Sequence, residues 1–208
     1  MFKQKLKQLI ESKLTEDGLF ETGVKGVRLF RVTEGVRCSP AIYEPAVIAI
    51  VSGTKEAIVD GKSYVYDAEQ YMCCCMSMPV EAGTPNASKE NPLLGVSIAL
   101  EPPMMTEVTM EYERATGVTR QPHSSALPPS IVLSSWDECF SEALYRILQL
   151  TQSAADTAIL GESRLREVYY AILKGNAGAS ASRAFGVDNE IARHSLFIKP
   201  FRQANHNR

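Results

Sequence analysis

The sequence predicts a mainly β fold with α-helices, in which short antiparallel strands form a barrel or sandwich and a helical segment follows. Between residues 44 and 100, short apolar runs alternate with turn residues, a pattern typical of a meander or barrel. Asp60-Gly61 separates two such runs, and an Asp-Gly pair supplies the positive φ angles of a type I′ hairpin turn. After Leu100 the apolar residues recur at helical spacing instead.

Length and composition are those of an ordinary globular protein. The 208 residues suffice for one well-buried domain with extensions or for two small ones, and 45% hydrophobic with 22% charged residues is a common balance. The formal net charge is −2, from 22 basic and 24 acidic residues, so no basic excess indicates nucleic-acid binding. We therefore do not expect this chain alone to bind DNA.

The N-terminus and the cysteines indicate a cellular compartment. Residues 1–14 lack the apolar core and cleavage site of a signal peptide, and no apolar run is long enough to predict a membrane span. The five cysteines, three of them adjacent, do not form a disulfide framework. These features predict a cytoplasmic protein with no membrane partner.

The first elements in chain order are a helix and two strands. Residues 2–14 place their apolar side chains on one helical face, which predicts a short amphipathic packing helix. From Gly23 the pattern alternates with period two, and residues 24–34 and 36–43 are predicted as strands. Pro40 within the second strand favours a position at a sheet edge.

The central unit contains the remaining predicted strands, at 46–51, 54–59, 62–66, 70–78 and 93–100. The loops between them are predicted at 52–53, 60–61, 67–68 and 83–92. Six or seven short strands without an intervening helix favour a closed barrel or a sandwich, because closure removes exposed sheet edges.

The remainder is predicted to be helical. A helix at 102–117 begins with prolines and ends at a glycine, and Asp137 is predicted as the N-cap of the next helix, at 137–150. A further helix is predicted at 153–174. The proline-rich stretch 119–131 is predicted as a loop, and the small polar residues 175–189 as a linker.

The strand region lacks the residues that metal-dependent catalysis requires. The three histidines, His123, His194 and His206, all lie outside it, which excludes a barrel site of the two- or three-histidine kind. No nucleophile elbow, phosphate-binding loop, dinucleotide fingerprint or zinc-protease motif occurs. We predict no catalytic residues, no metal and no cofactor.

The most unusual chemical feature is the run Cys73-Cys74-Cys75. In a strand, Cys73 and Cys75 share one face and Cys74 lies on the other. The first interpretation is small, polarizable core filling, and the alternatives are a thiol that meets a reactive ligand or oxidant and a soft-metal site. Met72, Met76 and Met78 flank the run and suit either a loose core or an adaptable apolar pocket. Tyrosines in or beside the strands either pack in the core or line a cavity; they are Tyr43, Tyr64, Tyr66 and Tyr71.

Several short motifs occur in a characteristic order. In the strand region they are Gly53 and Lys55, Asp60-Gly61, Tyr64 with Tyr66-Asp67, Tyr71, and Met78-Pro79. In the last predicted helix they are Glu167, Tyr170, Leu173 and Gly175. Over residues 20–175, this order and spacing resemble the N-terminal domain of AraC-type bacterial transcriptional regulators.

The resemblance implies a fold and a division of the chain. It implies a cupin-like double-stranded β-helix, or jelly-roll barrel, that binds a small effector, followed by a C-terminal helical subdomain that forms a dimer contact. It also implies that DNA is bound only through a C-terminal helix-turn-helix domain, which is absent from this chain. The predicted parts are an N-terminal amphipathic helix (1–20), the effector-binding barrel (21–100), a helical dimerisation segment (101–175), and a linker with the truncated start of the missing domain (176–208).

We therefore predict the effector-sensing and dimerisation portion of such a regulator, with an unknown small-molecule effector and a homodimer. The predicted ligand-binding residues are Tyr43, Tyr64, Tyr71, Cys73, Cys74, Cys75, Met76 and Met78. The predicted dimer stripe is Phe140, Leu144, Ile147 and Leu148, and packing on the barrel is its alternative. Competing functions are a cupin enzyme without histidine ligands, a cysteine-based redox or electrophile sensor, and a degenerate protein that dimerises with intact relatives and inhibits them. Which face of the 70–78 strand lines the pocket does not follow from the sequence.

Overall fold

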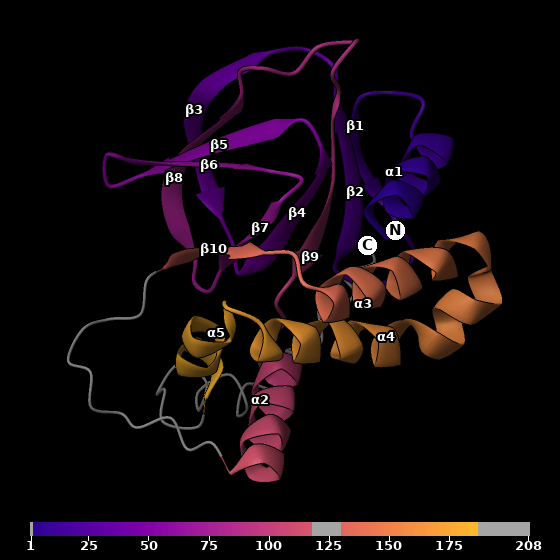
Figure 1. Ribbon diagram of the computed structural model, residues 1–208, viewed down its shortest axis with the longest axis vertical. Coiled ribbons are helices and arrows are strands. Elements are labelled where there is room, and N and C mark those ends of the chain that lie inside the picture. The colour runs from indigo at the N-terminus through magenta and orange to yellow at the C-terminus, as the bar shows by residue number, and fades with distance from the viewer. Residues whose placement is uncertain (1, 118–129, 187–208) are drawn as a thin grey trace, which may run out of the picture.

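The computed structural model describes residues 2–117 and 130–186, in which two antiparallel sheets close into a barrel (Figure 1). The six-stranded sheet has the order β1 (Gly18–Glu21), β2 (Val27–Val32), β9 (Leu93–Ala99), β4 (Ala46–Ser52), β7 (Gln70–Cys74) and β10 (Ile131–Ser135). The four-stranded sheet has the order β3 (Val36–Tyr43), β8 (Met78–Thr84), β5 (Thr54–Val59) and β6 (Lys62–Asp67). The prediction of a mainly β, cupin-like jelly-roll barrel followed by helices is confirmed.

The helices are α1 (Phe2–Lys13), α2 (Pro102–Thr116), α3 (Glu138–Gln149), α4 (Ala154–Lys174) and α5 (Gly178–Phe185), with a 3₁₀ turn η1 (Leu150–Gln152) between α3 and α4. In Figure 1, α2, α3, α4 and α5 gather below the barrel, and α1 lies beside β1 and β2. None of the helices within the described ranges is long and apolar enough to cross a membrane.

The hairpin between β5 and β6 has the predicted turn. Asp60 has a φ of 49° and Gly61 a φ of 74°, so both residues adopt the left-handed conformation of a type I′ turn. Val59 consequently pairs directly with Lys62. The predicted edge position of the proline-containing strand is also confirmed, since β3 forms one edge of the four-stranded sheet.

The six-stranded sheet is buried on both faces, and each face belongs to a different core. Between the sheets lies what we term the barrel core, made of Ile50, Ala57, Val59, Tyr66, Met72, Cys74, Met78, Val80, Ala87, Leu93 and Ile131. The opposite face of the same sheet packs against the helices in a larger helix–sheet core, to which β4, β7 and β9 contribute Val47, Ala49, Val51, Tyr71, Cys73, Leu94, Val96 and Ile98. Strands of this sheet therefore contact the barrel interior on one side and the helices on the other.

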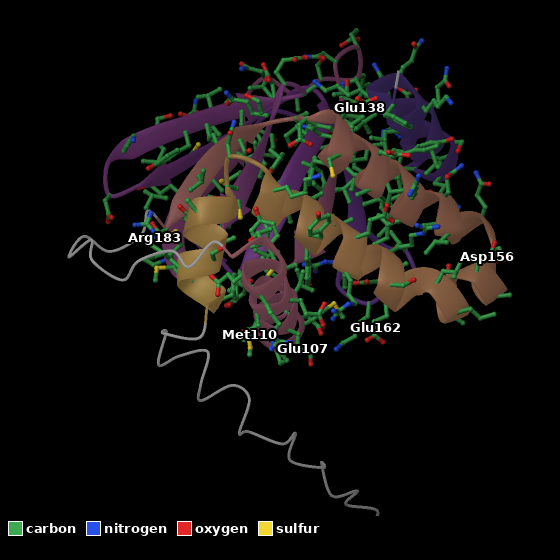
Figure 2. The ribbon with its side chains drawn as sticks, turned by 60° about the horizontal axis from the view of Figure 1, so that its bottom comes forward. Glu107, Met110, Glu138, Asp156, Glu162 and Arg183 are labelled. Carbon is green, nitrogen blue, oxygen red and sulfur yellow. The ribbon has the colours of Figure 1, made fainter. Side chains whose placement is uncertain are left out.

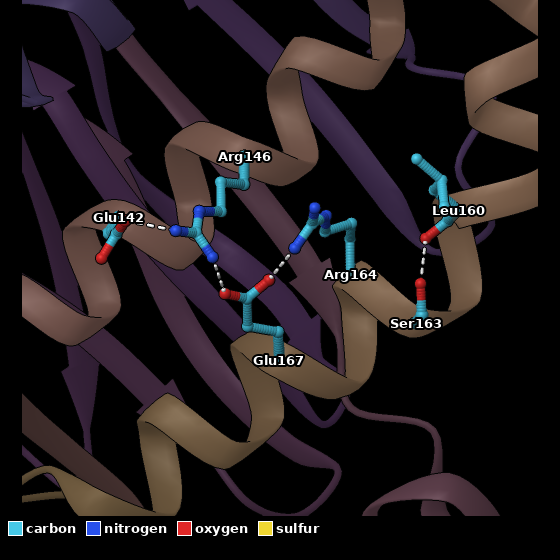
Figure 3. Close-up of polar contacts among 6 residues, drawn as sticks. All are labelled: Glu142, Arg146, Leu160, Ser163, Arg164 and Glu167. Atoms are coloured by element: carbon cyan, nitrogen blue, oxygen red, sulfur yellow. Dashed lines mark hydrogen bonds and ion pairs between the residues drawn. The ribbon is translucent and has the colours of Figure 1, made fainter.

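Helix α3 begins at the predicted N-cap, and ion pairs join α3 to α4. Asp137 accepts a hydrogen bond from the Phe140 amide at the start of α3, as predicted for its N-cap. Glu167 of α4 pairs with Arg164 of α4 and with Arg146 of α3, and Arg146 also pairs with Glu142 (Figure 3).

A second set of ion pairs joins α4 to α2. The Arg166 guanidinium lies 3.2 Å from the Glu107 carboxylate and 2.8 Å from that of Glu111. In Figure 2, Glu107 and Met110 mark α2 and Glu162 marks α4, and the two helices lie side by side there as in Figure 1. Both sets of pairs are partly exposed and contribute little stability individually, so the buried helix–sheet core holds the helices together.

Four strands differ from the sequence-based expectations. The predicted strand 70–78 is two strands, because the chain leaves the six-stranded sheet after Cys74 and enters the four-stranded sheet at Met78. β8 then continues to Thr84, into the expected loop 83–92. β1 and β10 were not predicted, and β10 starts at the end of the expected loop 119–131 and pairs with β7.

The expected linker 175–189 contains the helix α5. Gly178, Ser180, Ala181, Ser182 and Phe185 of this helix are buried, and it packs on α2 and α4. Small side chains permit this close approach. A Cβ added at Gly178 would lie 1.9 Å from the Leu173 carbonyl oxygen.

Candidate functional site

A cavity of about 620 Å³ opens between the two sheets of the barrel. Its apolar wall consists of Phe30, Val32, Ile48 and Leu93, with Leu19 and Ile42 at the mouth, where these two side chains are 53% and 72% exposed. Its polar lining consists of Asp17, Arg28, Arg31, Tyr43, Glu44, Lys55 and Ser97. Cavities of this size and composition bind small organic molecules in other proteins.

Strand alternation explains how these side chains meet. On β2, Arg28, Phe30 and Val32 face the barrel interior, while Val27 and Leu29 belong to the helix–sheet core. On β5, Lys55 shares the inner face with Ala57 and Val59, which are part of the barrel core. The cavity is thus formed by inward residues of strands that are far apart in sequence.

Gly95 of β9 makes room for the aromatic wall. A Cβ added at this position would lie 2.3 Å from Cζ of Phe30 and 2.6 Å from the carbonyl oxygen of Ala49. The absence of a side chain at Gly95 therefore lets the Phe30 ring lie flat on the sheet and keeps the space above it open.

Two buried phenols lie between the sheets. The hydroxyls of Tyr43 and Tyr66 are buried and lie close enough to influence each other, but within residues 2–117 and 130–186 neither forms a hydrogen bond of regular geometry. Burial raises the pKa of Tyr43 to about 12 and raises that of Tyr66 well above its ordinary value. Both groups therefore stay protonated at neutral pH and remain able to donate a hydrogen bond.

Two cationic side chains of the cavity form no direct polar contact with the described residues, although Glu21 of β1 is the residue paired with Arg28. In the described part of the chain, neither Arg28 nor Lys55 forms a hydrogen bond or an ion pair. Burial lowers the pKa of Lys55, with the nearby Cys38 acting weakly in the opposite direction. Arg31, by contrast, donates to the Thr15 carbonyl and lies 3.9 Å from Asp17.

The structure separates the predicted ligand-binding residues. Tyr43 lines the cavity, and Tyr64, Cys74 and Met78 lie in or against the barrel core. Tyr71, Cys73 and Cys75 point the other way, into the helix–sheet core. Met76 is exposed in the short connection between β7 and β8. The face of β7 that looks into the barrel is therefore the one carrying Met72 and Cys74.

Sequence reasoning did not select the cationic and aromatic lining at Arg28, Phe30 and Lys55. A signal for Lys55 was present, because a lysine two residues before Ala57 and four before Val59 occupies the inward face of a β-strand. A charged side chain at an inward position is unusual and indicates a binding role.

The cysteine triplet is buried, and its thiols are not uniformly activated. The Sγ atoms of Cys73 and Cys75 lie 3.7 Å apart, and Cys74 donates to the Met76 carbonyl. The contact with Cys75, together with burial, raises the pKa of Cys73, whereas the same contact lowers that of Cys75. Burial raises the pKa of Cys74 to about 11.

We expect the triplet to react slowly in the folded protein. With iodoacetamide at neutral pH, Cys139, which is partly exposed, should be alkylated at least about tenfold faster than Cys73 or Cys74, because the thiolate is the nucleophile and needs access. Cys75 should be the fastest of the three. Mass spectrometry of the peptides measures this, and protein unfolded in guanidinium, where all five cysteines react, is the control. Rapid labelling of the folded triplet would support the thiol-sensor alternative instead.

The predicted dimer stripe is occupied by the protein's own core. Phe140, Leu144, Ile147 and Leu148 are fully buried in the helix–sheet core. The stacked rings of Phe140 and Tyr71, with centroids 4.0 Å apart, attach α3 to β7. The stripe on α3 therefore packs on the barrel, which was the alternative given for it in the sequence analysis.

The residues described contain no group of three or more His, Cys, Asp or Glu side chains arranged to hold a metal ion. The three histidines lie outside the described residues.

Comparison with solved structures finds distant neighbours. The structure is similar to that of ToxT from Vibrio cholerae O395 bound to (E)-4-(8-methylnaphthalen-1-yl)but-3-enoic acid, at 11% identity and a TM-score of 0.49, covering 85% of this chain and 67% of that one. It is also similar to ToxT from Vibrio cholerae strain SCE256 with an unsaturated fatty acid bound (6%, TM-score 0.46, 83% and 58%) and to a cupin protein from Bacteroides fragilis (13%, TM-score 0.28, 42% and 84%). The chain spans 46% to 67% of the length of the ToxT structures that it matches.

A sequence comparison with curated proteins finds no match. The family model for the AraC-type transcriptional regulator N-terminus, however, matches residues 23–180, which is most of the chain and extends from β2 to the start of α5. The chain therefore belongs to the family of AraC-type transcriptional regulator N-terminal domains.

Proposed function

We propose that this chain is the effector-sensing part of an AraC-type regulator, and that it binds a small molecule in the cavity between the sheets to control DNA binding by the intact protein. The observation that carries the proposal is the cavity of about 620 Å³, whose apolar walls surround polar groups without partners. A buried polar group without a hydrogen bond is costly unless a ligand satisfies it.

A route from the cavity to the helices runs along β9. Leu93 and Ser97 line the cavity, while Leu94 and Val96 on the other face pack in the helix–sheet core. At the end of the strand, Tyr169 of α4 donates a hydrogen bond to the Ala99 carbonyl (2.6 Å). The Tyr169 hydroxyl also accepts one from the Glu101 amide (3.0 Å).

Effector occupancy would act through this connection. A ligand that binds one position of β9 better than another biases the position of α4 by the difference in its affinities for the two states. The ion pairs of Figure 3 and the shared core make α3 move with α4. The helical segment is therefore the output of the sensor in this proposal.

Dimerisation remains part of the proposal. Because the α3 stripe is buried, a homodimer formed by the helical segment would use exposed side chains instead. On α4, Ile159 and Leu160 are 78% and 38% exposed and suit such a contact.

We expect a bulky residue in the cavity to abolish effector binding. Ser97→Phe places a ring in the cavity without removing a buried apolar contact. The wild-type chain, screened against small metabolites by thermal unfolding, should be stabilised by a bound effector by about 2.7 kcal/mol at one hundred times its Kd, and Ser97→Phe should lose this shift.

Ser63→Phe, at an exposed position on the edge strand β6, is the matched control and should respond as the wild type does. A ligand that stabilises wild type and Ser97→Phe equally binds outside the cavity and would contradict the proposed site.

A further inference from the structure

The charges of the cavity indicate the chemical class of its ligand. Arg28 on β2 and Lys55 on β5 approach the cavity from opposite sheets, and neither is neutralised by a hydrogen bond or ion pair within the described residues. The charge state of Lys55 is coupled to the Cys38 thiol. Burial, followed by the Glu56 carboxylate, raises the pKa of this thiol, so it stays neutral and does not balance the lysine.

The two carboxylates of the lining are already engaged. Asp17 accepts hydrogen bonds from both the amide and the hydroxyl of Thr33, each at 2.7 Å, and lies near Arg31. Glu44 accepts a hydrogen bond from Ser77 and is exposed. What remains free toward the cavity is a set of donors: the Lys55 ammonium, the Arg28 guanidinium and the Tyr43 phenol.

Donors without acceptors favour a ligand that supplies acceptors. An anionic oxygen group accepts charge-assisted hydrogen bonds from lysine, arginine and a neutral phenol, whereas a cation or a neutral donor would leave them unsatisfied. The rest of the wall, from Phe30 and Val32 to Ile48 and Leu93, requires an apolar body.

We propose that the effector is an amphipathic organic anion, whose acidic group is held by Lys55 and whose apolar part lies against Phe30, Val32, Ile48 and Leu93. The proposal rests on the proposed function, because it names the ligand class of the same cavity. Lys55 is the main anchor, since it extends from the inner face of β5 next to Tyr66, its paired residue on β6. Arg28, four residues from Val32 along β2, offers a second contact for a longer or doubly charged molecule.

A pair of fluorescent probes separates charge from shape. The probes are 8-anilinonaphthalene-1-sulfonate, an aromatic anion, and N-phenyl-1-naphthylamine, the same ring system without the sulfonate. In Lys55→Met, the Kd of the anionic probe should rise at least about tenfold, the contribution of one hydrogen bond to a charged group, while the Kd of the neutral probe stays within about twofold. Lys55→Arg keeps the charge and should restore most of the affinity for the anion.

Lys62→Met is the matched control. It removes an exposed lysine from the same hairpin, where its Nζ lies 4.9 Å from the centroid of the Tyr64 ring, and should change neither Kd. Ser97→Phe should abolish the signal of both probes, which places them in the cavity. Circular dichroism of each variant verifies that it is folded.

The outcomes distinguish the two proposals. If Lys55→Met leaves the anionic probe bound as tightly as wild type does, while Ser97→Phe removes it, the anion proposal is wrong and the sensing cavity stands. If neither probe binds the wild type, or if both bind Ser97→Phe unchanged, the cavity is not a ligand site and both proposals fail.

Discussion

Phe140→Ala should lower the free energy of unfolding by about 3–5 kcal/mol, the usual loss when a large aromatic side chain is removed from a core. Phe140 is fully buried, its ring stacks on Tyr71 of β7, and Trp136 meets it edge-on with centroids 5.3 Å apart. The substitution removes these contacts at the point where α3 joins the barrel. Domains are stable by only about 5–15 kcal/mol, so urea unfolding followed by circular dichroism will measure the change easily.

Two further variants serve as controls for the loss of stability in Phe140→Ala. Val65→Thr replaces an apolar side chain that is 56% exposed on the edge strand β6 and should change stability by less than about 0.5 kcal/mol. Phe140→Leu keeps part of the volume and should lose clearly less than Phe140→Ala.

Phe140→Leu also tests the prediction that Phe140 forms a dimer contact. Sedimentation of wild type and Phe140→Leu over a range of concentrations should give the same oligomeric state, because Phe140 packs within its own chain. If Phe140→Leu had wild-type stability but a smaller oligomeric state than the wild type, Phe140 would belong to a dimer interface.

The elements with strong local signals were predictable from the sequence. Alternation identified β2, apolar runs bounded by turn residues identified β4, β5 and β6, and the Asp60-Gly61 turn fixed the register of its hairpin. Asp137 indicated the start of α3, because a carboxylate at the N-cap accepts a hydrogen bond from a backbone amide that has no partner within the helix. In each case the deciding interaction lies within a few residues along the chain.

The elements that were missed depend on distant contacts. β10 is a strand because it pairs with β7, some sixty residues earlier, and α5 is a helix because its small residues pack closely on α2 and α4. Taken alone, the composition of α5 is that of a linker. The crossing from one sheet to the other at Cys75 leaves the alternation of 70–78 unchanged, so periodicity does not reveal it.

The candidate site was only partly predictable for a related reason. Alternation separates Cys74 from Cys73 and Cys75, but it does not say which face looks into the barrel. That face is decided by what covers the sheet, and the helices cover the side of Tyr71, Cys73 and Cys75. The cavity is lined by residues of β2, β5 and β9, and of the predicted ligand-binding residues Tyr43 is the one among its lining.

Gly95→Ala should destabilise the barrel by about 1–3 kcal/mol and remove ligand binding together with that stability, as overpacking of a tight site does. The added Cβ would lie 2.3 Å from the Phe30 ring and 2.6 Å from the Ala49 carbonyl oxygen, so the ring must leave the sheet and enter the cavity. Urea unfolding measures the first effect, and titration with N-phenyl-1-naphthylamine, which needs no charge, measures the second.

A double-mutant cycle shows whether the Phe30 ring transmits the effect. Phe30→Leu introduced with Gly95→Ala relieves the ring contact but leaves the Ala49 carbonyl in place, so the pair should be non-additive by at least about 0.5 kcal/mol and should recover only part of the loss. Gly161→Ala is the matched glycine control, because its Cβ would meet Val24 at an ordinary 3.7 Å and α4 gains helix propensity, so the variant should be at least as stable as wild type. Strict additivity of Phe30→Leu and Gly95→Ala would mean that the aromatic wall does not rest on Gly95. In that case the open space of the cavity would need another cause than the missing side chain at this position.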